Sequence, residues 1–235
     1  MYTFDSRVRY SETDEKGLLS IAGIVDYFQD TSTFQSEDLG LGVEFLKKQD
    51  LAWVMSAWQI VIHSCPGLGE RITVGTFPYD FKGFMGMRNF FLMDEKGNRI
   101  VEANSVWTLL NIKKGLPVRA TQEMLDNYVL EEKLPMEYAP RKITVPDGGE
   151  KQDGFEVGRQ HLDSNHHVNN GQYIHMAMEY LPENFVVGQL RAEYKKQAHL
   201  HDRIVPIVYR DEDKMIVSLC SEQEEPYAIV ELKRM

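Results

Sequence analysis

Cysteine is scarce in this sequence, which limits the chemistry that the chain can perform. Only Cys65 and Cys220 occur among 235 residues, and no CxxC spacing is present. Such a pair provides neither a disulfide framework nor a cysteine-ligated zinc site. Sparse, unpatterned cysteines are typical of a reducing compartment, so we expect a cytoplasmic protein without a cofactor or a metal.

Long apolar runs and an excess of basic residues are also missing. The first residues, MYTFDSRVRYSETD, contain no apolar signal-peptide core, and no run approaches the ~18 apolar residues of a membrane helix. The 26 Lys and Arg residues are outnumbered by 36 Asp and Glu residues, for a net charge of −10. This balance argues against nucleic acid and anionic membranes as partners.

The first half has the pattern of one helix followed by strands. Hydrophobic residues make up 43% of the chain, enough for a sizeable core. Apolar residues recur at helical spacing between Ser20, a suitable N-cap, and Gly40, a stop signal, which predicts a helix over 20–39. Strand-like runs follow at 52–65, 70–81, 86–94 and 99–112.

The second half repeats this order. Asn169 or Asn170 can cap a helix that extends to Leu181, near Pro182. Strand-like runs follow at 187–197, 203–210, 214–220 and 227–233. Residues 133–150, with three prolines and two glycines, form an irregular crossing segment between the halves. The sequence therefore predicts an α+β chain with domains at 1–137 and 151–235 and a linker at 138–150.

Short matches between the halves favour a duplicated unit. An offset of 149 residues places DEKGLLS, which begins at Asp14, over DSNHHVN, which begins at Asp163. Farther on, GERITV (69–74) matches HDRIVP (201–206). The copies are unequal, because Leu18 falls on His167. One polar site for each chain, in the second half, is the economical interpretation.

The polar cluster DSNHHVNN (163–170) has the residue types of an acid–base site. On an extended approach to a helix, Asp163, Asn165 and His167 would point to the same side. A carboxylate can act as a base or orient an imidazole, an imidazole can move protons near pH 7, and an amide can hold a carbonyl oxygen. The free N–H groups of the following helix could stabilise an oxyanion.

Two other interpretations of the cluster remain open. Asp, Asn and His are common before helices, so Asn169 could simply be a cap. A metal could be held by Asp163, His166 and His167, with His199 and His201 as further ligands. Adjacent histidines on an extended chain point apart, however, which disfavours a metal site.

The same residues resemble a known family. DSNHHVNNGQYI (163–174) is similar to the D-x-N-x-H-V-N-N-x-x-Y-[IL] motif of fatty acyl–acyl carrier protein thioesterases. GMRNFFLMD (86–94), VWTLLNIKKGLPVR (106–119) and RAEYKKQA (191–198) resemble further segments of that family, in its order. The resemblance implies a tandem (double) hotdog fold, with two antiparallel sheets each wrapped around a long helix. It also implies hydrolysis of acyl thioesters on acyl carrier protein, which terminates fatty acid chain elongation.

Carried over by position, Asp163, Asn165 and His167 fall on the family's catalytic trio, and its Glu-Cys pair falls on Gln197 and Ala198. Alanine excludes a cysteine nucleophile, and a glutamine cannot accept a proton. We therefore expect Asp163, as base or nucleophile, and His167 to drive the reaction. Asn165 would orient Asp163 or the carbonyl, and Gln197 would position water or contact His167.

The resemblance also suggests where substrate and partner bind. The first domain, as the non-catalytic copy, would hold the acyl chain against apolar residues, for which the candidates are Trp53, Met55, Trp58, Met85, Met87 and Phe90. An acidic acyl carrier protein would need local basic residues, for which the candidates are Lys113, Lys114, Arg119, Arg141, Lys142, Lys195 and Lys196. A fused pair of units satisfies within one chain what single units achieve by dimerising, and it leaves room for a further homodimer.

Three rival functions stay open. The first is an acyl-coenzyme A thioesterase of the same fold, although no glycine-rich phosphate loop is present. The second is a hotdog dehydratase, a lyase that would leave the thioester intact. The third is a non-catalytic acyl-binding protein, which the glutamine at position 197 would permit.

Overall fold

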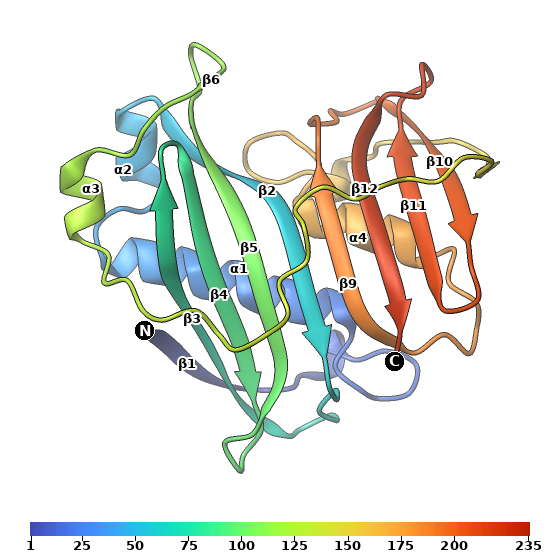
Figure 1. The fold of residues 1–235 in the computed structure, drawn as a ribbon, viewed down its shortest axis with the longest axis horizontal. Coiled ribbons are helices and arrows are strands. Elements are labelled where there is room, and N and C mark those ends of the chain that lie inside the picture. Colours follow the sequence, from blue (N-terminus) through green and yellow to red (C-terminus); the bar gives the residue numbers. More distant parts are fainter. The chain divides into compact units, whose positions relative to one another are not determined.

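All residues, 1–235, are described by a computed structural model, in which the chain forms two units (Figure 1). The first unit comprises Met1–Ser56 and Ile60–Tyr138, and the second comprises Ala57–Gln59 and Ala139–Met235. Each unit contains antiparallel strands and a main helix, so the prediction of an α+β chain is confirmed. None of the helices combines the length and the apolar character needed to cross a membrane.

The sheet of the first unit has the strand order β1-β3-β4-β5-β2. Its strands are β1 (Tyr2–Arg7), β2 (Leu51–Ile62), β3 (Arg71–Lys82), β4 (Met85–Met93), β5 (Arg99–Asn111) and the short β6 (Leu116–Pro117) beside β5. Its helices are α1 (Ile21–Asp38), α2 (Val43–Lys48), α3 (Gln122–Asp126) and the 3-10 turn η1 (Tyr10–Glu12). Strand β1, α2 and α3 were not predicted, because each is too short to show a clear hydrophobic period.

Helix α1 forms where the sequence predicts it. Ser20 caps it, since the Ser20 hydroxyl accepts a hydrogen bond from the N–H of Gly23 (3.0 Å). One face of the helix is buried, and Phe28 on this face packs on Phe90 of β4 with ring centroids 5.2 Å apart. Phe34, which shares the apolar spacing, instead stays 44% exposed.

The second unit repeats this arrangement in a shorter form. Its strands are β7 (Glu150–Lys151), β8 (Phe155–Glu156), β9 (Val187–Tyr194), β10 (Arg203–Arg210), β11 (Lys214–Cys220) and β12 (Pro226–Arg234). They follow the order β9-β12-β11-β10-β7, and β8 also pairs with β10. The 3-10 turn η2 (Arg159–His161) precedes helix α4 (Asn170–Met178). Helix α4 has 9 residues against 18 in α1, and it ends before Leu181.

The strands predicted at 52–65 and 187–197 both end early, for the same reason. After β2, the N–H groups of His63 and Ser64 both donate to the carbonyl of Ile100. After β9, the N–H groups of Lys195 and Lys196 both donate to the carbonyl of Tyr227. Two successive donors on one acceptor break the alternation of a ladder, so regular pairing stops there. The two units therefore share a backbone irregularity that the side-chain pattern does not reveal.

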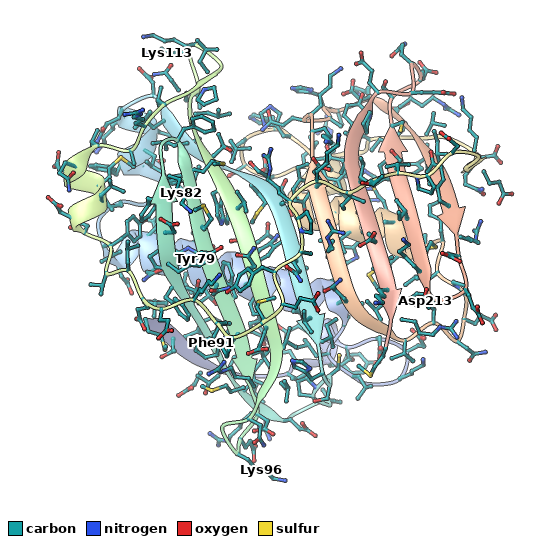
Figure 2. The ribbon with its side chains drawn as sticks, in the orientation of Figure 1. Tyr79, Lys82, Phe91, Lys96, Lys113 and Asp213 are labelled. Carbon is teal, nitrogen blue, oxygen red and sulfur yellow. The ribbon has the colours of Figure 1, made fainter.

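The irregular segment at 133–150 is packed against both sheets rather than free. Leu134 is buried against Phe77 and Phe91 in the first unit. Figure 2 marks Phe91 and Tyr79 on the same sheet, whose β5 runs between turns that carry Lys96 and Lys113. In the second unit, Ile143 is buried against other isoleucines, and its N–H donates to Glu193 (2.9 Å). The irregular segment thus contributes a buried side chain to the core of each unit.

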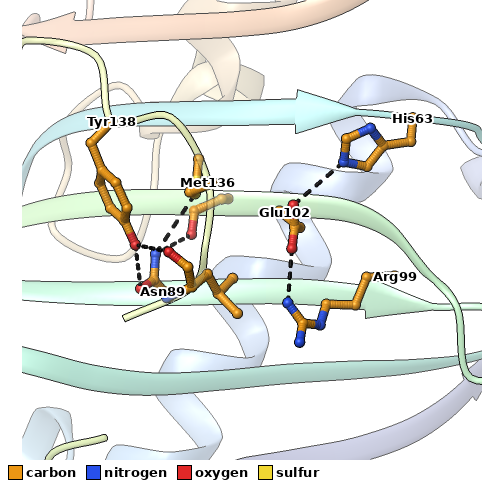
Figure 3. Close-up of polar contacts among 8 residues, drawn as sticks. His63, Asn89, Arg99, Glu102, Met136 and Tyr138 are labelled. Atoms are coloured by element: carbon orange, nitrogen blue, oxygen red, sulfur yellow. Dashed lines mark hydrogen bonds and ion pairs between the residues drawn. The ribbon is translucent and has the colours of Figure 1, made fainter. Parts of the chain in front are cut away.

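Asn89 of β4 is the polar centre of this packing in the first unit (Figure 3). Its side chain is fully buried and donates to the carbonyl of Ala103 (3.0 Å). Its amide oxygen accepts from the N–H of Leu134 (3.1 Å) and the hydroxyl of Tyr138 (2.9 Å). One asparagine therefore connects two strands and the irregular segment.

We expect Asn89→Ala to lower the free energy of unfolding by about 2–4 kcal/mol, because it leaves buried partners without a hydrogen bond. Tyr138→Phe removes only one of these bonds and should cost about 1 kcal/mol. Urea denaturation followed by circular dichroism measures both. Tyr10→Phe is the control, since Tyr10 is 83% exposed. An Asn89→Ala protein as stable as the control would contradict this role.

Candidate functional site

The segment that contains Asp163, Asn165 and His167 forms a tight turn, so the predicted extended geometry is wrong. Oδ1 of Asp163 accepts hydrogen bonds from the N–H groups of Asn165 (2.8 Å) and His167 (3.3 Å). The N–H of Asp163 donates to the carbonyl of His167 (2.8 Å), and Leu162 bridges Val168. The chain reverses because an aspartate that accepts backbone N–H groups two and four residues ahead favours a turn over a strand.

The first unit builds the same turn from different side chains. Oδ1 of Asp14 accepts from the N–H groups of Lys16 (2.9 Å) and Leu18 (3.0 Å). Gly17 has φ 73°, and His166, at the matching place, has φ 63°. The left-handed region costs a glycine little but strains a histidine. The two aspartates therefore have the same structural task, and this task does not require a histidine.

His167 lies where the turn meets the segment after β9. It forms an isolated bridge with His199, and the N–H of Val168 donates to the carbonyl of Ala198 (3.0 Å). Partial burial and, next, His199 lower the pKa of His167 below its usual value, while Asp163 opposes this shift. The imidazole of His167 is therefore mainly neutral at pH 7, which is the form that can accept a proton.

His199 is a site residue that the sequence suggested only as a metal ligand. Its ring meets the ring of His167 edge to face, with centroids 4.8 Å apart and planes at 79°. Oδ2 of Asp202 accepts a hydrogen bond from the N–H of His199 (2.8 Å). The sequence signal that could have located His199 is the match of GERITV with HDRIVP, because HDRIVP begins two residues after His199. Only the turn reveals that this segment reaches His167.

Asn165 lies two residues before His167, and Gln197 directly precedes Ala198, whose carbonyl accepts from Val168; neither side chain makes a hydrogen bond within the chain. Asn165 and Gln197 are both exposed. The expected hydrogen bond from Gln197 to His167 is absent. Ala198 is fully buried, and its N–H donates to the hydroxyl of Tyr173 (2.9 Å). The structure thus brings Asp163, Asn165 and His167 into one turn and places Gln197 beside it.

The start of α4 offers fewer donors than predicted. The N–H of Asn169 donates to the carbonyl of His161 (2.9 Å), and the N–H of Gln172 donates to the carbonyl of Asn169 (2.9 Å). The N–H of Gly171 donates to Oδ1 of Asn169 (2.8 Å), so Asn169 is the helix cap. These three amides have acceptors within the chain, which leaves Asn170 as the remaining candidate for an oxyanion donor.

No group of three or more His, Cys, Asp or Glu side chains is arranged to hold a metal ion. The side chain of His201 is hydrogen-bonded to Glu156 (Nδ1 to Oε1, 2.5 Å). Cys65 and Cys220 are not joined, and burial raises the pKa of both thiols. Neither thiol is therefore activated as a nucleophile.

Several residues predicted to bind the acyl chain or the carrier protein are buried or already paired with other side chains of this chain. Phe90 and Met55 are fully or almost fully buried, and Trp53 packs on Phe81. Lys195 forms an ion pair with Glu193. Ion pairs also join Lys196 to Glu225 (3.3 Å) and Lys113 to Asp50 (2.9 Å). These carboxylates reduce the positive charge that the three lysines could offer to an acidic partner.

Comparison with known protein families shows to which family the chain belongs. Residues 1–128 match the acyl-ACP thioesterase N-terminal domain, and residues 144–226 match the C-terminal domain of the same family. The chain belongs to the acyl-ACP thioesterase family. The resemblance seen in the sequence is thereby confirmed.

Individual relatives agree with this assignment. The chain is 26% identical over 208 residues to acyl-[acyl-carrier-protein] hydrolase FATB1 of Cuphea viscosissima, covering 81% of this chain and 49% of the relative. It is 25% identical to the palmitoyl-acyl carrier protein thioesterase of Gossypium hirsutum, covering 81% and 50%. The chain thus spans about half the length of the curated relatives it matches.

Solved structures show the same fold. A crystal structure of an acyl-ACP thioesterase from Bacteroides thetaiotaomicron has a TM-score of 0.90 at 20% identity, covering 99% of this chain and 97% of the other. The 12:0-ACP thioesterase from Umbellularia californica has a TM-score of 0.87 at 16% identity, covering 99% and 97%. At these identities the likeness concerns the fold.

The shared turn predicts a shared cost of substitution. Asp14→Ala and Asp163→Ala should each lower the free energy of unfolding by about 1–2 kcal/mol, because each leaves two backbone N–H groups without an acceptor. The corresponding Asn variants keep an acceptor oxygen and should lose less. Urea denaturation of the four variants provides the measurement. Equal stability of the Ala and Asn variants would refute the anchoring role.

Proposed function

We propose that this chain hydrolyses the thioester between a fatty acyl group and acyl carrier protein, releasing a free fatty acid. The observation that carries the proposal is the turn that holds His167 against His199, within a segment that resembles the family's D-x-N-x-H motif. Membership of the acyl-ACP thioesterase family and the names of the relatives support this substrate class. The acyl carrier protein is then the partner.

We also propose that the two units form the tandem hotdog fold that the family resemblance implies. In the first unit, α1 packs by its buried face against strands of the antiparallel sheet. In the second, α4 buries Tyr173 and Ile174. Matching turns before both helices support a duplicated unit. The first unit would hold the acyl chain, and the second would carry the polar site.

In the proposed mechanism, His167 is the general base. Neutral His167 removes a proton from a water molecule as the water oxygen attacks the thioester carbonyl. The carbon–sulfur bond then breaks, and the protonated imidazole returns the proton to the departing thiolate. Asn165 and Gln197, whose amides have no partner within the chain, would bind the carbonyl oxygen and the water. A water nucleophile explains how the reaction proceeds without an activated thiol.

Asp163 anchors the turn in this mechanism rather than attacking the substrate. Its Oδ1 already accepts two backbone N–H groups, as Oδ1 of Asp14 does in the first unit. Its negative charge also favours the protonated form of His167 that arises during the reaction. Of the two roles that the sequence left open, this geometry favours His167 as the group that takes the first proton.

We expect His167→Ala to reduce kcat for thiol release by about 100-fold or more, because it removes the general base. Release of carrier-protein thiol from acyl substrates of several chain lengths, followed with a thiol-reactive dye, gives both the rate and the chain preference. His175→Ala is the matched control, since His175 is exposed on α4. Thiol release unchanged in His167→Ala would refute the site. Release from acyl-coenzyme A alone would replace the carrier protein as substrate.

Asp163→Asn distinguishes an anchor from a nucleophile. The asparagine keeps the acceptor oxygen, so we expect kcat to stay within about tenfold of the wild-type value. Loss of the negative charge lowers the pKa of His167 further, so the acid limb of the kcat/KM profile should move to lower pH. The pH dependence of thiol release measures both. A loss as large as that of His167→Ala would instead make Asp163 the base or nucleophile.

A further inference from the structure

The two imidazoles of the second unit form a pair that the proposed mechanism does not yet use. The ring edge of one meets the ring face of the other, at 4.8 Å between the centroids of His167 and His199. Their backbones are also joined by the isolated bridge between these residues. His199 therefore limits the orientations that the ring of His167 can adopt.

His199 is itself held by Asp202 from the same loop. Oδ2 of Asp202 accepts from the N–H of His199 and lies 3.7 Å from Nδ1 of the ring. The N–H of Asp202 donates to the carbonyl of His199 (3.1 Å), which closes the turn. The hydroxyl of Tyr227 also donates to Oδ2 of Asp202 (3.4 Å). Asp202 therefore fixes the loop that presents His199 to His167.

The first unit shows that this pair is not needed to build the loop. There, Leu18 and Gly67 form the bridge that His167 and His199 form in the second unit. The N–H of Leu19 donates to the carbonyl of Pro66, as that of Val168 donates to Ala198. The same backbone thus folds without either imidazole. A side-chain function is the remaining reason for two histidines at these matching places.

We propose that His199 is a positioning residue for His167, which fixes the orientation of its ring for the attack on the thioester. This inference rests on the proposed role of His167 in thioester hydrolysis. The charged and titratable groups that face His167 are Asp163 and His166 from its own turn and His199 from the segment after β9. Asp163 favours the protonated form, and His199 is the opposing group outside the turn. His199 directly follows Gln197 and Ala198, the two positions onto which the resemblance carries the family's Glu-Cys pair.

Two substitutions separate orientation from charge. His199→Phe keeps an aromatic ring against His167 but carries no proton, so kcat at pH 8 should fall less than it does in His199→Ala. The acid limb of kcat/KM should move to higher pH, which lowers kcat/KM at pH 5.5 by roughly threefold relative to the wild type. His199→Ala removes both effects, so we expect in addition an about tenfold fall in kcat at pH 8 with little change in KM.

NMR titration of the His167 ring gives a readout that needs no substrate. The midpoint should rise in both His199 variants and stay unchanged in the control His201→Asn, because an asparagine tolerates the left-handed backbone at position 201 (φ 69°). The side chain of His199 is 60% exposed, so its loss leaves the fold intact. An unchanged midpoint together with an unchanged acid limb would overturn the inference. Absence of thiol release from the wild type would overturn the proposed function instead, and the titration would still report on the pair.

Discussion

The acceptance of two backbone N–H groups by one aspartate oxygen is the interaction on which the site depends. Oδ1 of Asp163 closes the turn, and the closed turn brings His167 against the segment after β9. The same turn sets Asn169 at the start of α4, where it caps the helix. A carboxylate suits this task because it accepts several hydrogen bonds at once and keeps no donor that needs a partner. The position of the imidazole is thus a consequence of backbone geometry.

The absence of an activated thiol is consistent with this arrangement. Ala198 occupies the place of the family's cysteine and is fully buried, with its N–H bonded to Tyr173. The carbonyl of Ala198 accepts from Val168, so this residue joins the turn to the strand segment. A small apolar side chain allows that close approach of two backbones. In the proposed mechanism, the chemistry is left to His167 and to the exposed amides of Asn165 and Gln197.

The sequence predicted those parts of the fold whose signals are local. Helix α1 was found because its apolar period is long and Ser20 caps it, and the long strands were found from their apolar runs. The early ends of β2 and β9 were missed, because a shared acceptor carbonyl lies on another strand. Proline and glycine in 133–150 indicated irregular backbone correctly. Proline and glycine could not indicate that Leu134 and Ile143 are buried, because the side chains that cover these two residues come from strands distant in the sequence.

The sequence singled out residues that share one turn in the structure, but it did not predict the geometry of that turn. The motif at 163–170 selected Asp163, Asn165 and His167, but alternation along an extended chain was the wrong basis for placing them together. The turn depends on hydrogen bonds between side chain and backbone, which have no hydrophobic period. His199 was undervalued because its contact with His167 joins residues far apart in the sequence. Only the paired backbones show that the two histidines are neighbours.

Comparison of the two units explains how such a site can be added at little cost to the fold. Leu18, at the place of His167, is 38% exposed, and His167 is itself only partly buried. A residue at this position contributes little to either core, so its identity is free to serve chemistry. The clear local cost is the left-handed backbone of His166, where the first unit has Gly17. The two units share the backbone hydrogen bonds of the turn, and in the proposed mechanism the side chains on that backbone provide the function.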